Sequence, residues 1–514
     1  MSKVRRITTM AAIFGLLSLA ASLPAAARTS TSTKTTTTST TAPGFSYGEL
    51  GSNGTGLPAT TSGCGFNNAG EPSAHVSKGN QVLVGSERGV GDGTDAWVRD
   101  NLTSPPQGPV GGAGASACSL YYDGQPNGVA GVGAAGGDVD TAFGSAPEPV
   151  TGFYPMYVAS LNLGSVAVAH SLDNGTTWQN TPVQAGLPGD DREWIAAYGL
   201  NTSLLTYHDI ASSEIDVLRS DNAGAAYTQI SQAIPLTGPY AYTADDNQHG
   251  NLVIDHNNPG TVPAPVGFRA YQSFVAPSSA PSTSKNLGCL APSLFVCTIH
   301  NEAFVSVSTD GGFTWTVKPV PCSVGNQDLG NQFPNVSVAP NGNLWETWAA
   351  GSQDSNGNIT GGAVYAAVSP DQGNSWTCAK VGSGIMPWLV AGASGEDLVF
   401  YGASGSTWSV MFAQNTSTTS PSGFKTTSVV PVHSGPVCGS GAGCSGSRQL
   451  FDDFAVDTDQ SGWAHIAYSH DCSGPLLGAF GPVLCSSPPS QLGGPNSYTG
   501  YAVQTAGTTI GAPN

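Results

Sequence analysis

The sequence contains few charged residues, and several of them occur in clusters whose residue types could do chemistry. Charged residues make up 10% of the chain. A histidine beside a carboxylate can bind a metal ion or orient a water molecule, and an arginine can pair with an anion through two parallel hydrogen bonds. Three clusters carry these residue types: Asp191-Arg192-Glu193, His208-Asp209 and His470-Asp471.

These clusters lie at the ends of short strands in a repeating pattern. Gly, Pro, Ser, Thr and Asn interrupt the chain every few residues, and short alternating apolar runs dominate, which indicates an all-β protein. A unit of two strands joined by a polar turn recurs, with starts near residues 71, 137, 192, 250, 331, 386 and 451. A period of roughly 50 to 65 residues in an all-β chain is typical of four-stranded propeller blades.

The repeats therefore predict a single β-propeller of four-stranded antiparallel blades over residues 45–514, with the repeats running from about 71 to 504. We expect seven blades, with six as the alternative. The last unit supplies no clear fourth strand of its own. The stretch around Phe45-Ser46-Tyr47 is predicted to complete that blade.

An eight-residue turn motif occurs three times, each time between two of the repeated strand pairs. SLDNGTTW at 171–178 returns as STDGGFTW at 308–315 and SPDQGNSW at 369–376, and a decayed copy, SDNAGAAY, occupies 220–227. Each copy follows a third strand, so it should join strands three and four. The carboxylate can accept turn N–H groups, the glycine can adopt positive φ, and the tryptophan can pack between neighbouring sheets. We expect a structural role for Asp173, Gly175, Trp178, Asp310, Gly312, Trp315, Asp371, Gly373 and Trp376.

The expected blade geometry places these turns away from the chemistry. Turns 1–2 and 3–4 share one face, whereas the loops that enter strand one and leave strand two share the opposite face around the central channel. Polar residues collect at the second set of positions: Glu71, Asp138, Asp245-Asp246, His249, Asn331-Gln332 and Asp452-Asp453 at the starts, and Glu87-Arg88, Trp348 and Tyr401 at the ends, besides the three clusters above. This indicates a concave polar site at that rim, or, equally, polar loop residues that only cap strands.

The repeated turn resembles the Asp box, or BNR repeat, of the sialidase superfamily, and the resemblance covers about 71 to 504. It implies a sialidase-like β-propeller and an exo-sialidase type of glycoside hydrolase acting on extracellular glycans. Sialidases hold a substrate carboxylate with three arginines, and use a Tyr activated by a Glu as nucleophile and an Asp as acid/base. Carried onto this sequence, the resemblance implies Arg88, Arg192 and Arg448 for the anion, Asp191 as acid/base and Tyr401 or Tyr468 as nucleophile.

Other functions stay open at this point. His208, Asp209, His470 and Asp471 are further catalytic or binding candidates. The chain could instead be a non-catalytic propeller that binds a glycan or protein at its rim. A third option is a wall-associated structural module.

The N-terminus indicates export. Residues 1–27 combine a basic start, an apolar run and an Ala-x-Ala site, as in a signal peptide, and the Ser/Thr-rich residues 28–44 read as a disordered spacer. We expect a secreted, extracellular monomer without a membrane span, with cell-wall association as one option. The formal net charge of −18 argues against nucleic acid or anionic membrane as the partner, so the expected partner is an extracellular glycan or glycoconjugate.

The ten cysteines suggest disulfides in an exported chain, with a zinc site as the weaker reading because no CxxC occurs. Pairing of sequence neighbours predicts Cys64–Cys118, Cys289–Cys297, Cys322–Cys378, Cys438–Cys444 and Cys472–Cys485. We expect no cofactor. Calcium stays an option at Asp457-x-Asp459-x-Ser461-Gly462, which begins like a calcium loop but has Tyr468 in the twelfth position.

Overall fold

The structure is a computed structural model that describes the chain from residue 42 with gaps. The described residues are 42–52, 64–65, 67–89, 91–99, 110–127, 136–162, 165–183, 190–209, 212–257, 260, 267–280, 300–322, 327–329, 333–439, 444, 450–471 and 497–514. The expected signal peptide, 1–27, and nearly all of the expected spacer, 28–44, lie outside them. The described residues belong to the unit Thr41–Asn514.

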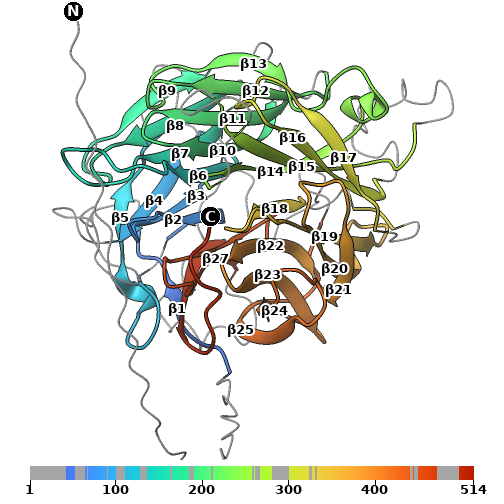
Figure 1. The fold of residues 1–514 in the computed structure, drawn as a ribbon. Helices are drawn as coiled ribbons and strands as arrows, with labels where there is room; N and C mark the ends of the chain where they lie inside the picture. Colours follow the sequence, from blue (N-terminus) through green and yellow to red (C-terminus); the bar gives the residue numbers. More distant parts are fainter. Residues whose placement is uncertain are drawn as a thin grey trace, which may run out of the picture. The chain divides into compact units, whose positions relative to one another are not determined.

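This unit contains seven four-stranded antiparallel sheets, so the all-β propeller of seven blades is confirmed (Figure 1). The first blade comprises β2 (Gly70–Val76), β3 (Val82–Glu87), β4 (Thr94–Arg99) and β5 (Leu120–Gly124), with the short 3-10 helix η1 (Ala117–Ser119) before β5. The second comprises β6 (Val139–Phe143), β7 (Met156–Asn162), β8 (Ser165–Ser171) and β9 (Gln179–Val183). The third comprises β10 (Asp190–Tyr198), β11 (Thr202–Asp209), β12 (Ile215–Ser220) and β13 (Thr228–Gln232).

The remaining blades follow the same order from the channel outwards. The fourth comprises β14 (Gln248–Asp255), β15 (Arg269–Ala276), β16 (Glu302–Ser308) and β17 (Thr316–Val320), preceded by η2 (Ala241–Ala244). The fifth comprises β18 (Asn335–Val338), β19 (Leu344–Gln353), β20 (Ile359–Ser369) and β21 (Thr377–Gly382). The sixth comprises β22 (Ile385–Gly392), β23 (Gly395–Ser404), β24 (Thr407–Asn415) and β25 (Lys425–Ser434).

The seventh blade joins the two ends of the described chain. It comprises β26 (Ala455–Thr458), β27 (Ala464–His470), β28 (Tyr498–Ala506) and, outermost, β1 (Gly44–Glu49). The antiparallel register runs from Gly44 opposite Ala506 to Glu49 opposite Gly500. The N-terminal stretch thus completes the last blade, as predicted, and Figure 1 shows β1 beside the C-terminal strands.

Hydrogen bonds from buried side chains cross every interface between neighbouring blades. At five interfaces a side chain near the channel accepts a backbone N–H of the next blade: Asp457 from Val76, Ser73 from Thr141, Asp140 from Ile195, Asn251 from Val336 and Asn335 from Leu389, at 2.7–3.1 Å. His256 contacts the Ala197 carbonyl at 2.9 Å, and the Tyr401 hydroxyl accepts the Ser469 N–H at 2.9 Å. Because each bond joins two sheets, the ring is held by directional contacts as well as by apolar packing.

The repeated turn closes strands three and four through its aspartate. Asp173 Oδ1 accepts the Thr177 N–H at 2.8 Å and Asp173 Oδ2 accepts the Thr177 hydroxyl at 2.7 Å. Asp310 and Asp371 make the same bonds. The three turn glycines have φ of 84°, 94° and 84°, in the region that a Cβ penalises.

The turn tryptophans reach back to the preceding blade. The Trp178 indole N–H donates to Asp123 of the first blade at 2.7 Å, and that of Trp315 donates to Ser231 of the third blade at 3.1 Å. Trp376 is half-buried, and Gly373 of its turn lies against Lys318 of the fourth blade. The turns therefore tie adjacent sheets together at the pole opposite the strand-one starts.

Three of the five predicted disulfides are confirmed: Cys64–Cys118, Cys322–Cys378 and Cys438–Cys444. The second joins the end of the fourth blade to β21 of the fifth. The cysteines of the pairs predicted at 289–297 and 472–485 lie outside the described residues.

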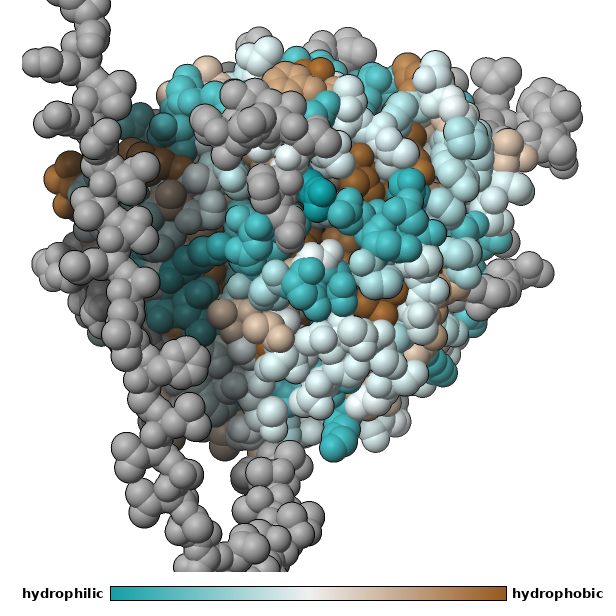
Figure 2. Space-filling model, in the orientation of Figure 1, coloured by the Kyte–Doolittle hydropathy of each residue, from teal (hydrophilic) through white to brown (hydrophobic). Residues whose placement is uncertain are grey.

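Few large apolar side chains reach the surface of the described part. Tyr47, Val150, Leu236 and Phe313 are the exposed ones, and they lie in different blades or loops. Figure 2 shows hydrophilic and hydrophobic residues interspersed on the visible face. Among the described residues, no helix has the length and apolar character needed to cross a membrane.

Candidate functional site

A bulge at the start of the innermost strands turns charged side chains toward the axis. Glu71 in β2 and Arg192 in β10 have φ of 50° and 51°, a conformation uncommon for residues other than glycine. The strand register shifts around both residues, between Gly70 and Ser73 and between Asp191 and Glu193. Such bulges re-aim side chains, and here they aim Glu71 and Arg192 at each other.

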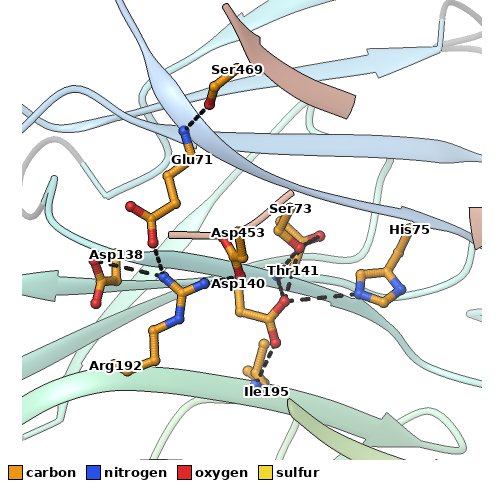
Figure 3. Close-up of polar contacts among 10 residues, drawn as sticks. All are labelled: Glu71, Ser73, His75, Asp138, Asp140, Thr141, Arg192, Ile195, Asp453 and Ser469. Carbon is orange, nitrogen blue, oxygen red and sulfur yellow. Dashed lines mark hydrogen bonds and ion pairs between the residues drawn. The ribbon is translucent and has the colours of Figure 1, made fainter. Parts of the chain in front are cut away.

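Arg192 is the centre of a closed ionic cluster (Figure 3). Its side chain is 1% exposed; Nη1 pairs with Glu71 and lies 3.7 Å from Asp138, and Nη2 pairs with Asp453. The three carboxylates come from the first, second and seventh blades, whereas Arg192 belongs to the third. The guanidinium carbon of Arg192 also lies over the Trp194 ring, 4.4 Å from its centroid. One cation thus joins four blades at the axis.

Three carboxyl groups surround Arg192, and burial raises the pKa of two of them, Glu71 and Asp453. Burial raises the pKa of Glu71 well above its usual range, although Arg192 opposes the shift. Burial also raises the pKa of Asp453 to about 6, again against Arg192. Burial alone would lower the pKa of Arg192, but Asp453 and Glu71 together raise it. Arg192 therefore stays protonated, whereas Glu71 and Asp453 hold protons at mildly acidic pH.

A hard cation would find ligands at the same place. Carboxylate atoms of Glu71, Glu87 and Asp138 all lie within 4.8 Å of one another. Oxygen ligands of this kind suit Ca²⁺ or Mg²⁺. By contrast, the calcium option at Asp457 and Asp459 draws no support from the geometry. Asp459 accepts four backbone N–H groups, and Asp457 accepts two.

Several residues predicted from the sequence lie at the same end of the channel as Arg192, Glu71, Asp138 and Asp453, which we call the polar pole. Asp191 pairs across the strands with His208, beside Asp209, at the end of the third blade. Arg88 lies in the first blade, where its Nη1 is 3.6 Å from Asp95. Arg448 lies outside the described residues. Arg88 and Arg192 are thus each beside carboxylates of their own chain.

The two tyrosines suggested as nucleophiles are buried. Tyr401 and Tyr468 have no exposed surface, and burial raises the pKa of both hydroxyls. The Tyr401 hydroxyl bridges the sixth and seventh blades through Ser469.

His470 and Asp471 lie at the end of β27 in the seventh blade. His470 is buried, which lowers its pKa to about 4, and its Nε2 is 3.6 Å from Glu49. Asp471 pairs with Nδ1 of His433 at 2.6 Å. The structure therefore engages these two residues in separate pairs.

Sequence reasoning placed Glu71, Asp138 and Asp453 on the rim without giving them roles. Their position at strand-one starts was the only signal, and their shared partner lies 121 and 261 residues away from Glu71 and Asp453 respectively. Glu193 follows Arg192 directly in the sequence, and no separate role is predicted for it. It is fully buried, and burial raises its pKa well above the usual range.

The opposite pole of the channel holds a cavity of about 160 Å³. All seven innermost strands contribute to its largely apolar wall, together with Pro513 and Asn514. His75 supplies a cation there, 3.4 Å from Asp457 and 3.9 Å from Asp140. Burial opposes its charge, but the two aspartates raise the pKa of His75 to about 10.

No protein-family model matches the sequence. The curated proteins likewise include no significant match. Among solved structures, an α-L-arabinofuranosidase of Fusarium graminearum in complex with arabinobiose is similar over 89% of this chain and 97% of its own, with 13% identity and a TM-score of 0.38.

Two further solved structures are similar to a comparable degree. An ulvan lyase, a polysaccharide lyase, matches over 80% of this chain and 92% of its own, with 11% identity and a TM-score of 0.44. A fucose-specific lectin from Aleuria aurantia matches over 71% and 97%, with 12% identity and a TM-score of 0.38. Likeness at this level carries no argument about function. What the chain's own sheets establish is an all-β propeller of seven blades with a polar pole around Arg192.

Proposed function

We propose that the protein is a secreted glycoside hydrolase that acts on an extracellular glycan at the polar pole, with Asp138 and Asp453 as its acid–base pair. The observation that carries this proposal is the placement of these two carboxylates on the two ends of one buried guanidinium. Their side chains are 14% and 10% exposed, whereas Glu71 is fully buried. They are therefore the members of the cluster that can meet a substrate.

The chemistry follows from the proton held by Asp453. With a pKa of about 6, its carboxyl group can protonate the leaving oxygen as the glycosidic C–O bond breaks. Asp138 takes the proton from the water that attacks the anomeric carbon. Arg192 is a positioning residue, because it touches both acids and is closed off from solvent.

The sialidase form of the hypothesis draws less support. A clamp for a sugar carboxylate needs free cations, and Arg88 and Arg192 lie beside Asp95 and the axial carboxylates. A tyrosine nucleophile needs access, and Tyr401 and Tyr468 are buried. We therefore infer a neutral glycan as substrate, and Asp191 stays a prediction for the acid/base role.

The test is a screen of the purified chain on fluorogenic aryl glycosides, from about pH 4 to pH 8, the range in which raised carboxyl pKa values titrate. The panel contains neutral pentosides and hexosides and one sialoside. Turnover of a neutral glycoside that declines as the pH rises through about 6 supports the proposal. Turnover of the sialoside alone would return the assignment to an exo-sialidase.

A binding function without catalysis is the second candidate. It is favoured by the closure of the cluster, because both terminal nitrogens of Arg192 are engaged by carboxylates of the chain. In that case a glycan array would show saturable binding while every glycoside in the panel stays intact.

A further inference from the structure

Three of the nine histidines gather at the polar pole where the third and fourth blades meet. His208 is the penultimate residue of β11, His249 is the second residue of β14, and His300 precedes β16 by two residues. The rings of His208 and His249 face each other, with centroids 5.8 Å apart and planes inclined by 31°. Burial lowers the pKa of His208, and His300 lies close enough to His208 for its charge to lower this pKa further.

The facing imidazoles leave nitrogens without a protein partner. Nε2 of His208 and both ring nitrogens of His249 are buried and accept or donate no hydrogen bond within the described part of the chain. His249 has no exposed surface at all. Buried polar atoms in native proteins are nearly always bonded, and exceptions often mark a water or an ion. Imidazole nitrogens without a hydrogen bond on two neighbouring rings are groups that a metal ion can bind.

The surroundings resemble the outer support of a metal ligand. The ring of His208 hydrogen-bonds to the backbone of Ser213, and such a bond fixes which nitrogen carries the lone pair. The same Ser213 carbonyl accepts Asn247 Nδ2 at 3.0 Å. The His208 ring is thereby held in one orientation, and its Nε2 has no hydrogen bond to the described residues.

A carboxylate–histidine pair lies near His208. Nε2 of His300 is 2.8 Å from Asp246 Oδ1, and the side chains are 14% and 15% exposed. Asp246 Oδ2 is buried and has no hydrogen-bond partner among the described residues. Asp246 is three residues before His249 in the chain.

We propose that His208 and His249 bind a divalent transition-metal ion of the Zn²⁺ class, with the neighbouring Asp246–His300 pair as the source of a further ligand. Imidazole nitrogens select such ions, whereas Ca²⁺ and Mg²⁺ prefer oxygen. The site is therefore chemically distinct from Glu71, Glu87 and Asp138, which offer oxygen only. Nearby Arg192 is itself paired with Glu71 and Asp453. The proposal does not depend on the hydrolase assignment.

The test is calorimetric titration of the full chain, freed of metal with a chelator, with ZnCl₂ and separately with CaCl₂. We expect one saturable Zn²⁺ site. His208→Gln and His249→Gln should each weaken it by about 10-fold or more, the cost typical of a lost ligand or supporting contact. His433→Gln is the matched control, because His433 is also buried and paired with an aspartate, in the sixth blade.

A second readout keeps the proposal decidable if a histidine variant folds poorly. Co²⁺ added to the wild-type chain should give visible absorption from nitrogen ligation, which Zn²⁺ then displaces. Asp246→Asn, which preserves size, should weaken Zn²⁺ binding while the variant keeps the wild-type circular dichroism spectrum. No saturable Zn²⁺ binding, or binding equal in wild type, His208→Gln and Asp246→Asn, would overturn the proposal.

Discussion

At the scale of single residues, burial decides what the charged groups of the axis can do. Arg192 is enclosed by the three carboxyl groups that it contacts, so it fixes their positions and has no free edge for an anionic ligand. Asp138 and Asp453 keep partial access to solvent. The same cluster therefore contains one structural cation and two candidate reacting acids.

Replacing Arg192 should lower the free energy of unfolding more than replacing another arginine of similar burial. Arg192→Met leaves buried carboxylates without a partner, and we expect a loss of about 3–5 kcal/mol in the free energy of unfolding at pH 7. Arg219→Met is the control, because Asp221, its partner, has a side chain that is 59% exposed. Urea unfolding measures both; an equal loss for the two variants would contradict the role given to Arg192.

His75 should make stability depend on pH in a defined window. Its pKa is raised from 6.5 to about 10 in the folded chain, so its charge stabilises the fold fully below about pH 6.5, and this contribution is lost as the pH rises through 10. Allowing for solvent screening of a side chain that is 33% exposed, we expect wild type to exceed His75→Gln by about 2 kcal/mol at pH 6. The difference should vanish above about pH 10. A difference that grows with pH in urea unfolding would have the wrong sign.

At the scale of elements, the repeated turn explains why strands three and four could be located from the sequence. Its aspartate and glycine are needed for a local geometry, so the motif appears wherever that geometry does. The turn at 308–315 follows strand three of its blade, β16, which ends at Ser308, and precedes strand four, β17, which begins at Thr316. Contacts of the turn with other blades, such as Trp178 with Asp123, have no local signal.

Truncating one turn aspartate should cost stability but leave the polar pole intact. Asp310 accepts the Thr314 N–H at 2.9 Å, and Ala would leave this group and two hydroxyls unpaired. We expect Asp310→Ala to lower the free energy of unfolding by about 1–2 kcal/mol. Asp92→Ala, at an exposed position, should change it by less than about 0.5 kcal/mol. If Asp310→Ala kept the fold but lost ligand binding, the binding site would lie at the pole of the repeated turns, which would contradict the proposal.

At the scale of the whole molecule, closure of the ring depends on a strand from the far end of the chain. β1 pairs with β28, and Phe45 packs edge-on against Phe412 of the sixth blade, with ring centroids 5.1 Å apart. Glu49 accepts the Asn67 N–H at 3.0 Å and so anchors the segment that follows. The repeats predict the seven blades, and the missing fourth strand of the last unit predicts that the N-terminal stretch completes that blade.

Deleting β1 should therefore loosen the entire propeller. A chain that begins after Glu49 exposes the edge of β28 and loses the β1 contacts, so we expect a lower Tm and a less cooperative transition. A chain that begins at residue 42 keeps β1 and is the control. Identical calorimetric transitions for the two chains would show that β1 is dispensable for closure.

The candidate site was less predictable than the fold, for a physical reason. Strand ends carry a local signal, which is why Arg192 and Asp453 could be placed on the rim. Which of them touch depends on how seven sheets meet at the axis, and Arg192 is 261 residues from Asp453 in sequence. Burial, which separates Asp138 from Glu71 as a candidate reacting group, likewise exists only in the assembled ring.

The most direct test of the central claim, that Asp138 and Asp453 form an acid–base pair, is kcat/KM on the neutral glycoside that the screen identifies. We predict that Asp138→Asn and Asp453→Asn each lower kcat/KM by about 10²–10⁴-fold, while Asp92→Asn matches wild type. The decline of kcat/KM through about pH 6 should disappear in Asp453→Asn. Wild-type kcat/KM in either axial variant, with an unchanged pH profile, would contradict the assignment.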